Sequence, residues 1–236
     1  MEKGKLYLIP NVIAEETQQA VIPPHIREAL PSIQYFLAED IRTARRYLSS
    51  LKIYESIEAL AFEVLNKNTK VEAIKVMFKP VFEGKDIGVI SESGCPGVAD
   101  PGALAVKYAH ENDIQVVPLV GPSSLLLALM ASGLNGQRFT FHGYLPFDGK
   151  DASTIVKALE KESHTKNQTQ IFIETPYRNN AIMSVLLKNL KDDTLLCVAI
   201  DVTGKDEYIK TFTVKKWKTV KSQFPKTPAV FLFLSP

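Results

Sequence analysis

The chain has 236 residues, of which 45% are hydrophobic and 23% charged, values that are typical of globular proteins. Its 28 Lys and Arg and 26 Asp and Glu give a net charge of +2, so the field of the whole chain cannot attract nucleic acid and a local basic patch would be needed. Cys95 and Cys197 lie far apart without metal-binding spacing, and we therefore expect no disulfide, no metal site and a cytoplasmic location.

The first half of the chain alternates short apolar runs with amphipathic stretches. Strands are expected at residues 6–9, 35–38, 87–90 and 115–119. Helices are expected around residues 26–30, 43–51, 55–67 and 104–111. Such alternation predicts a mostly parallel sheet with helices on both faces. The apolar stretch 116–131 is shorter than a membrane span and is interrupted by Gly-Pro-Ser-Ser, so no membrane contact is expected.

The second half continues the alternation with a different kind of connection. Strands are expected at 139–143, 170–174, 195–200, 211–214 and 229–234, and helices at 153–162 and 179–190. The later strands are joined by short polar turns, which favour antiparallel neighbours and hence a mixed sheet. The predicted fold class is α/β with two α/β domains, residues 1–119 and 120–236.

The Gly-rich turn at residues 90–102 is the best candidate for a ligand site. Gly94, Gly97 and Gly102 can adopt positive φ and let a ligand approach the backbone, and the carboxyl end of a strand is where open α/β sheets bind ligands. Alternatively, the turn is only a tight connection in which Asp100 caps the next helix. The clustering of three glycines favours ligand contact. The pattern is neither a phosphate loop nor a dinucleotide fingerprint, so nucleoside triphosphates and NAD are not predicted.

Three further segments could take part in chemistry. The turn 121–124, Gly-Pro-Ser-Ser, opens a helix whose free amides suit a carboxylate or hydroxyl, although a plain capped helix start explains it equally well. Residues 38–42 place two carboxylates, Glu39 and Asp40, beside Arg42 after a strand, and residues 174–178 place the single carboxylate of Glu174 near Arg178 after another strand. Paired carboxylates beside a cation can perform acid–base work, and the alternative is an ordinary helix start with stabilising acids.

Lysines gather in sequence near the C-terminus. They are Lys205, Lys210, Lys215, Lys216, Lys218, Lys221 and Lys226. A solvated face is the favoured interpretation, and a phosphate-binding face is the alternative.

Taken together, six blocks in this order resemble the tetrapyrrole methylase family of S-adenosylmethionine-dependent methyltransferases. The blocks are Leu6–Pro10, Ala38–Arg42, Ser91–Gly102, Val116–Pro122, Gly143–Pro146 and Glu174–Arg178. The resemblance is strongest to the branch that methylates ribose 2′-hydroxyls of small-subunit ribosomal RNA, and the blocks span nearly the whole chain.

The resemblance implies two α/β domains with S-adenosylmethionine in the cleft between them, and a homodimer. It implies cofactor contacts at Pro10, Ser93, Gly94, Cys95, Pro96, Val98, Asp100, Ser123, Ser124, Phe141, Tyr144, Leu145, Pro228 and Ala229. On the acceptor side, the candidate catalytic residues are Glu39, Asp40, Arg42, Glu174 and Arg178. The expected partner is ribosomal RNA or the small ribosomal subunit, with no membrane and no metal.

Two alternatives stay open, and two departures from the family pattern favour the second of them, a non-catalytic module. The family's first loop contains a glycine that residues 10–16, Pro-Asn-Val-Ile-Ala-Glu-Glu, have lost, and Ile41 replaces a threonine. Methylation of a tetrapyrrole or another small molecule is one alternative. The other is a non-catalytic module that binds the cofactor without turnover.

Overall fold

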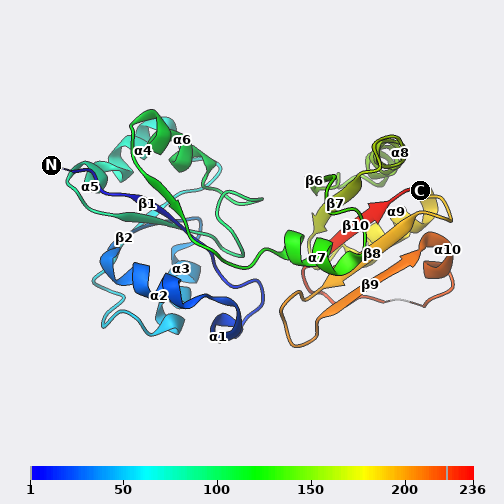
Figure 1. The fold of residues 1–236 in the computed structure, drawn as a ribbon, viewed down its shortest axis with the longest axis horizontal. Coiled ribbons are helices and arrows are strands. Elements are labelled where there is room, and N and C mark those ends of the chain that lie inside the picture. The colour runs from blue at the N-terminus through cyan, green and yellow to red at the C-terminus, as the bar shows by residue number, and fades with distance from the viewer. Residues whose placement is uncertain (1, 222) are drawn as a thin grey trace. The chain divides into compact units, whose positions relative to one another are not determined.

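Residues 2–221 and 223–236 are described by the computed structural model, and they alternate strands and helices as the sequence predicts (Figure 1). The chain divides into two units, Met1–Ser123 and Ser124–Pro236. The boundary falls beyond the predicted division after residue 119, because the turn before Ser124 packs with the first unit: the Cys95 thiol donates to the Pro122 carbonyl at 3.4 Å.

The first unit is built on an all-parallel sheet with the strand order β3-β2-β4-β1-β5. The strands are β1 (Leu6–Ile9), β2 (Tyr35–Ala38), β3 (Ala61–Val64), β4 (Ile87–Ile90) and β5 (Val116–Pro118). All four residues of the central strand β4 are buried, as expected for a parallel strand that is covered on both faces.

Helices cover both faces of this sheet (Figure 1). One face carries α1 (Gln18–Val21), α2 (Pro24–Ala29), a 3₁₀ turn (Leu30–Ser32) and α3 (Ile41–Leu51). The other face carries α4 (Val71–Met77), α5 (Lys79–Phe82) and α6 (Ala103–Glu111). Two separate apolar clusters fill the spaces between sheet and helices, so the strand ends are held rigidly from both sides.

The predicted helix over residues 55–67 is wrong. This segment contains an exposed edge strand, β3, which pairs with β2 in parallel. The ring of Phe62 stacks on that of Phe36 with 5.4 Å between centroids. Pairing with the open edge of β2 and this aromatic contact override the helical spacing of apolar residues, since local propensity is weaker than tertiary context.

The second unit is built on a mixed sheet with the order β6-β7-β10-β8-β9. Its strands are β6 (Phe139–Tyr144), β7 (Thr169–Glu174), β8 (Leu195–Ile200), β9 (Tyr208–Thr213) and β10 (Ala229–Leu234). β6 and β7 are parallel, whereas β10 runs antiparallel to β7 and β8, and β9 antiparallel to β8. The predicted α/β fold class, with one parallel and one mixed sheet, is confirmed.

The helices of the second unit are α7 (Ser124–Ser132), α8 (Gly149–Lys166), α9 (Asn179–Asn189) and α10 (Val214–Trp217). The strand predicted at 211–214 is shifted, because Thr213 ends β9 and caps α10 by accepting from the Lys216 amide. Helix α8 starts earlier than predicted because Asp148 caps it. Within the described ranges, no helix combines the length and the apolarity needed to cross a bilayer.

Candidate functional site

The loops that follow β1 and β4 meet at the carboxyl edge of the first sheet. These two strands are neighbours, yet the chain leaves β1 toward the face that carries α2 and leaves β4 toward the face that carries α6. In open α/β sheets such a change of direction creates the crevice in which ligands bind. The Gly-rich turn lies on this edge, as its position after a strand predicts.

Asn11 ties the two loops together. It is buried, and its amide nitrogen Nδ2 donates to the carbonyls of Ser91 at 3.0 Å and Glu92 at 3.2 Å. Its backbone N–H donates to the Gly94 carbonyl at 2.9 Å, which forms an isolated bridge between the loops. The loop that lacks the family's glycine is therefore anchored to the Gly-rich turn by a side chain.

We expect Asn11→Ala to lower the free energy of unfolding by about 2–3 kcal/mol, because it leaves the buried Ser91 carbonyl and the partly buried Glu92 carbonyl without their donor. Asn11→Asp is expected to cost more, since its carboxylate faces those carbonyl oxygens and cannot donate. The matched control is Asn112→Ala, which removes a single bond to the Tyr108 carbonyl. Calorimetric melting measures all three variants, and an Asn11→Asp protein as stable as the wild type would contradict the assignment.

The Gly-rich turn adopts the backbone that its glycines predict. Gly94, Gly97 and Gly102 all have positive φ, at 69°, 79° and 150°. Gly102 occupies the N-cap position of α6 without a side-chain bond, so Asp100 does not cap this helix and the purely structural interpretation loses its main support. Pro96 is buried, whereas Val98 and Ser93 are exposed.

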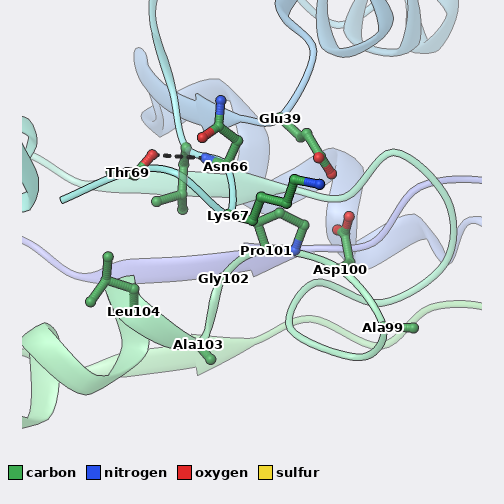
Figure 2. Close-up of a pocket in the computed structure, with 11 residues that line it drawn as sticks. Glu39, Asn66, Lys67, Thr69, Ala99, Asp100, Pro101, Gly102, Ala103 and Leu104 are labelled. Atoms are coloured by element: carbon green, nitrogen blue, oxygen red, sulfur yellow. Dashed lines mark hydrogen bonds between the residues drawn. The ribbon is translucent and has the colours of Figure 1, made fainter. Parts of the chain in front are cut away.

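A pocket of about 460 Å³ opens beside this turn, within the first unit (Figure 2). Its walls come from the segments that follow β2, β3 and β4. Figure 2 shows the carboxylates of Glu39 and Asp100 and the amine of Lys67 pointing into the same space. The backbone N–H of Asn66 donates to the Thr69 hydroxyl at 2.9 Å and shapes the wall that carries Lys67. The pocket thus joins acid–base groups to the Gly-rich turn.

The carboxyl groups at this edge influence one another. Burial, together with the negative charges of Glu39 and Glu92, raises the pKa of Asp100 to about 6 against the opposing effect of Ser91. Burial also raises the pKa of Glu92, with smaller contributions from Glu39 and Asp40. Asp100 therefore changes protonation close to neutral pH, which suits a group that accepts a proton.

The two acidic residues after β2, Glu39 and Asp40, have different roles. Asp40 is the N-cap of α3: its carboxylate accepts from the Thr43 amide at 2.6 Å, and this bond lowers its pKa. This is the helix-start role that the sequence left open. Glu39, by contrast, lines the pocket, while Arg42 lies exposed in the first turn of α3. The backbone of Pro10 is also fixed, since the Tyr47 hydroxyl donates to its carbonyl at 2.8 Å.

A second group of predicted residues meets at one end of the second sheet. Glu174 pairs with Ala229, and Ala229 pairs with Ile200, so the ends of β7 and β8 lie beside the start of β10. The end of β6 lies there too, because β6 and β7 are parallel. Phe141 and Tyr144 flank an irregularity in that pairing. This topology brings together seven of the predicted residues of the second unit: Phe141, Tyr144, Leu145, Glu174, Arg178, Pro228 and Ala229.

Glu174 and Arg178 form a buried ion pair at this sheet end. Their side chains are 0% and 19% exposed, and Arg178 Nη1 lies 3.4 Å from Glu174 Oε2. The pair does not meet hydrogen-bond geometry, so among the described residues Oε2 has no donor. Oε1 accepts from the Thr175 amide at 2.7 Å, and Arg178 Nη2 donates to the Pro146 carbonyl at 2.8 Å. Arg178 thereby fixes the loop after β6.

Two asparagines that the sequence analysis did not single out hold the segment before β10. Asn179 Nδ2 donates to the Thr227 carbonyl at 2.7 Å and the Pro225 carbonyl at 3.2 Å. Asn180 exchanges two bonds with the backbone of Phe224. The Oδ1 atom of Asn179 is buried and has no donor within the described chain. Asn179 and Asn180 follow Arg178 directly in sequence, but their hydrogen-bond partners lie more than forty residues away. The local sequence therefore gives no sign of this role.

The other predicted cofactor contacts lie in different environments, and not all of their side chains are accessible to a ligand. Leu145 is buried in the core of the second unit, so only its backbone is available to a ligand. Ser124 is the first residue of α7, and Ser123 precedes it at the end of the first unit. Cys95 is half-buried, and burial raises the pKa of its thiol. Among residues 2–221 and 223–236, no cluster of three His, Cys, Asp or Glu side chains could hold a metal ion.

The C-terminal lysines do not form one patch. Lys205 and Lys226 lie at the sheet end that carries Glu174, in the segments after β8 and before β10. Lys215 and Lys216 lie at the opposite end, in α10, which follows β9. Lys218 lies just beyond α10 and pairs with Asp192 at 2.6 Å. The favoured interpretation as a solvated face therefore suits the α10 group, and only Lys205 and Lys226 lie at the end of the second sheet that carries Glu174.

Known proteins resemble this chain over most of its length. The chain is 31% identical over 223 residues to ribosomal RNA small subunit methyltransferase I of Escherichia coli O157:H7, covering 92% of this chain and 68% of that protein. A protein of the same name from Buchnera aphidicola subsp. Schizaphis graminum (strain Sg) is 28% identical, with 97% and 78% covered. The crystal structure of the methyltransferase CobJ superposes with a TM-score of 0.62 at 14% identity, covering 99% of this chain and all of that one, which shows a shared fold. Residues 12–217 match the family of tetrapyrrole (corrin/porphyrin) methylases, and the chain belongs to this family of methyltransferases.

Proposed function

We propose that this protein transfers a methyl group from S-adenosylmethionine to a ribose 2′-hydroxyl of small-subunit ribosomal RNA, in the cytoplasm and as a homodimer. The RNA substrate is supported by the names of the relatives, which match 92–97% of the chain. The observation that carries the proposal is the pocket at the carboxyl edge of the first sheet, where Glu39 and Asp100 meet the Gly-rich turn. The homodimer is tested by sedimentation analysis of the purified protein.

The residues present suit S-adenosylmethionine. When bound, this cofactor supplies a methyl group on a positively charged sulfur that is a good leaving group. At the carboxyl edge of the first sheet, the carboxylates of Glu39, Glu92 and Asp100 outnumber the one amine of Lys67, and this excess of negative charge favours such a cation. In the second unit, Glu174 Oε2 and Asn179 Oδ1 are buried acceptors that no donor of the described residues reaches, and such acceptors suit an amino group of a ligand.

The chain's own residues then have distinct tasks. Gly94 and Gly102 give the turn a backbone that most side chains could not adopt, and Asn11 holds it against the loop after β1. Asp100 is the proposed acceptor of the hydroxyl proton, because its pKa of about 6 keeps it ionised yet basic at neutral pH. Glu39 orients the hydroxyl beside it. Arg178, through the Pro146 carbonyl, positions the loop after β6.

The direct experiment is transfer of a labelled methyl group to small ribosomal subunits that lack the modification, with calorimetry of S-adenosylmethionine binding as a companion. Label in the RNA that resists alkali at a single linkage identifies a ribose 2′-O-methyl group. Cofactor binding without transfer to RNA, but with transfer to a tetrapyrrole, would replace this proposal with the small-molecule alternative. Cofactor binding without any transfer would leave the non-catalytic module, and the anchored first loop argues against that outcome.

A further inference from the structure

Two aromatic rings stand out from the surface of the second unit beside the Glu174–Arg178 pair. Phe147 is 86% exposed and Tyr177 is 80% exposed, in segments that follow β6 and β7 at the same end of the sheet. Exposing large apolar rings to water is unfavourable, and exposed aromatic clusters commonly mark binding surfaces. We name Phe147 and Tyr177 the aromatic pair.

Each ring of the aromatic pair lies next to a cation. The guanidinium of Arg178 lies 4.8 Å from the centre of the Phe147 ring, and the amine of Lys226 lies 5.3 Å from the centre of the Tyr177 ring. Lys205 adds a further positive charge at this end of the sheet. A ligand that is both flat and negatively charged fits such an alternation of rings and cations.

The backbone that carries the rings and cations is well anchored. Arg178 Nη2 bonds to the Pro146 carbonyl directly before Phe147, and Asp148, directly after it, caps the 18-residue helix α8. Asn179 bonds to the carbonyls on both sides of Lys226. Because these segments are already ordered, binding would not have to supply the full cost of ordering them.

We propose that the aromatic pair stacks against unpaired bases of the RNA substrate while Lys226 contacts the adjoining phosphates. The proposal rests on the proposed RNA methyltransferase function and adds the surface that grips the substrate. Stacking on aromatic rings beside cations is how proteins recognise single-stranded RNA, whereas the deep groove of an RNA duplex hides its bases. The cations favour RNA over an apolar protein partner for the same surface.

The first test uses fluorescence. Trp217 is the chain's one tryptophan, is fully buried and donates to the Leu196 carbonyl, so it gives a constant background. Phe147→Trp places a second tryptophan in the aromatic pair. A short oligouridylate is expected to quench its emission in a saturable and salt-dependent manner, and an RNA duplex of equal length to quench it much less. Equal quenching by the duplex, or none by the oligouridylate, would overturn the proposal.

The second test measures affinity and turnover. Phe147→Ala, Tyr177→Ala and Lys226→Gln are expected to weaken oligouridylate binding, the aromatic changes by about 5- to 100-fold, and to raise KM for small ribosomal subunits. Cofactor affinity should stay unchanged. Matched controls lie at the opposite end of the same sheet: Phe139→Ala, whose ring is 42% exposed at the start of β6, and Lys215→Gln.

The outcomes separate this proposal from the function on which it rests. If the wild type methylates subunits and the aromatic variants keep its KM and its RNA affinity, the aromatic pair is not the RNA surface although the function stands. If the variants change the sedimentation of the protein instead of its RNA affinity, the rings belong to a protein–protein interface and the proposal is wrong. If the wild type methylates no RNA, the proposed function itself fails.

Discussion

Arg178→Ala is expected to lower the free energy of unfolding of the second unit by about 3–5 kcal/mol, because it leaves the fully buried carboxylate of Glu174 without its cation. The loss also frees the Pro146 carbonyl from its donor. Chemical denaturation followed by the fluorescence of Trp217 reports on this unit, since that side chain lies in its core. Arg178→Lys is expected to recover only part of the loss, because an ammonium cannot reach both partners as the planar guanidinium does.

A double-mutant cycle isolates the ion pair. In a Glu174→Gln background no charge is left buried, so Arg178→Ala should cost clearly less than in the wild type. An equal cost in both backgrounds would show that Arg178 stabilises the unit only through the loop after β6. Arg178→Ala should also weaken cofactor binding, because it displaces the loop after β6. The first unit of this variant should melt at the wild-type temperature, and calorimetry can measure both effects.

The strands were the most predictable part of the fold. Runs such as Ile87–Ile90 are apolar throughout because β4 is covered on both faces, and only a buried parallel strand or a buried helix produces such a pattern. The edge strand β3 carries no comparable signal, since three of its four residues are exposed. Its conformation depends on the open edge of β2, which is distant in sequence, so the spacing of its apolar residues predicts a helix that does not form.

The candidate site was predictable where its chemistry depends on local backbone. Glycine at positions 94, 97 and 102 allows positive φ to be predicted from the sequence, and the structure has it at all three. For Asn11 and Asn179, no feature of the local sequence predicts their role. Asn11 bonds to carbonyls 80 and 81 residues away, and Asn179 to carbonyls 46 and 48 residues away. Asparagines are common in loops, so only the folded chain distinguishes those that hold two loops together.

The electrostatic effect of neighbouring carboxyl groups on Asp100 also could not be predicted from the sequence. Glu39, Glu92 and Asp100 come from two separate loops, and the sequence offered Asp100 as a helix cap or a cofactor contact. Once folded, the three carboxyl groups share one edge of the sheet. Burial, followed by the negative charges of neighbouring carboxylates, raises the pKa of Asp100 and of Glu92. The unusual acid among them is Asp100, and its identity follows from burial rather than from residue type.

Asp100→Asn is expected to reduce kcat/KM for methyl transfer by about 10²–10⁴-fold, the usual contribution of a general base. In the wild type, kcat/KM should rise with pH through an apparent pKa of about 6, because only ionised Asp100 accepts the proton. The variant should lose this rise. Glu92→Gln removes one negative neighbour and should move the rise to lower pH. A wild-type profile that is flat between pH 5 and pH 7 would contradict the role.

Asp100→Asn should also make the first unit more stable. If Asp100 served only to stabilise the fold, its replacement would lower the stability instead. The pKa of this carboxyl is about 6 in the folded chain, against an ordinary value of 3.8 for an aspartate, so the unfolded chain ionises first as pH rises. Stability is therefore lost between these two values and stays lower above pH 6. Asn does not ionise, and after allowance for partial solvent screening Asp100→Asn should gain about 1–2 kcal/mol at neutral pH and almost nothing at pH 4. Calorimetric melting at both pH values measures the difference. A gain confined to neutral pH, together with lost turnover, would mean that the fold tolerates an unfavourable, partly buried charge where the reaction needs a base.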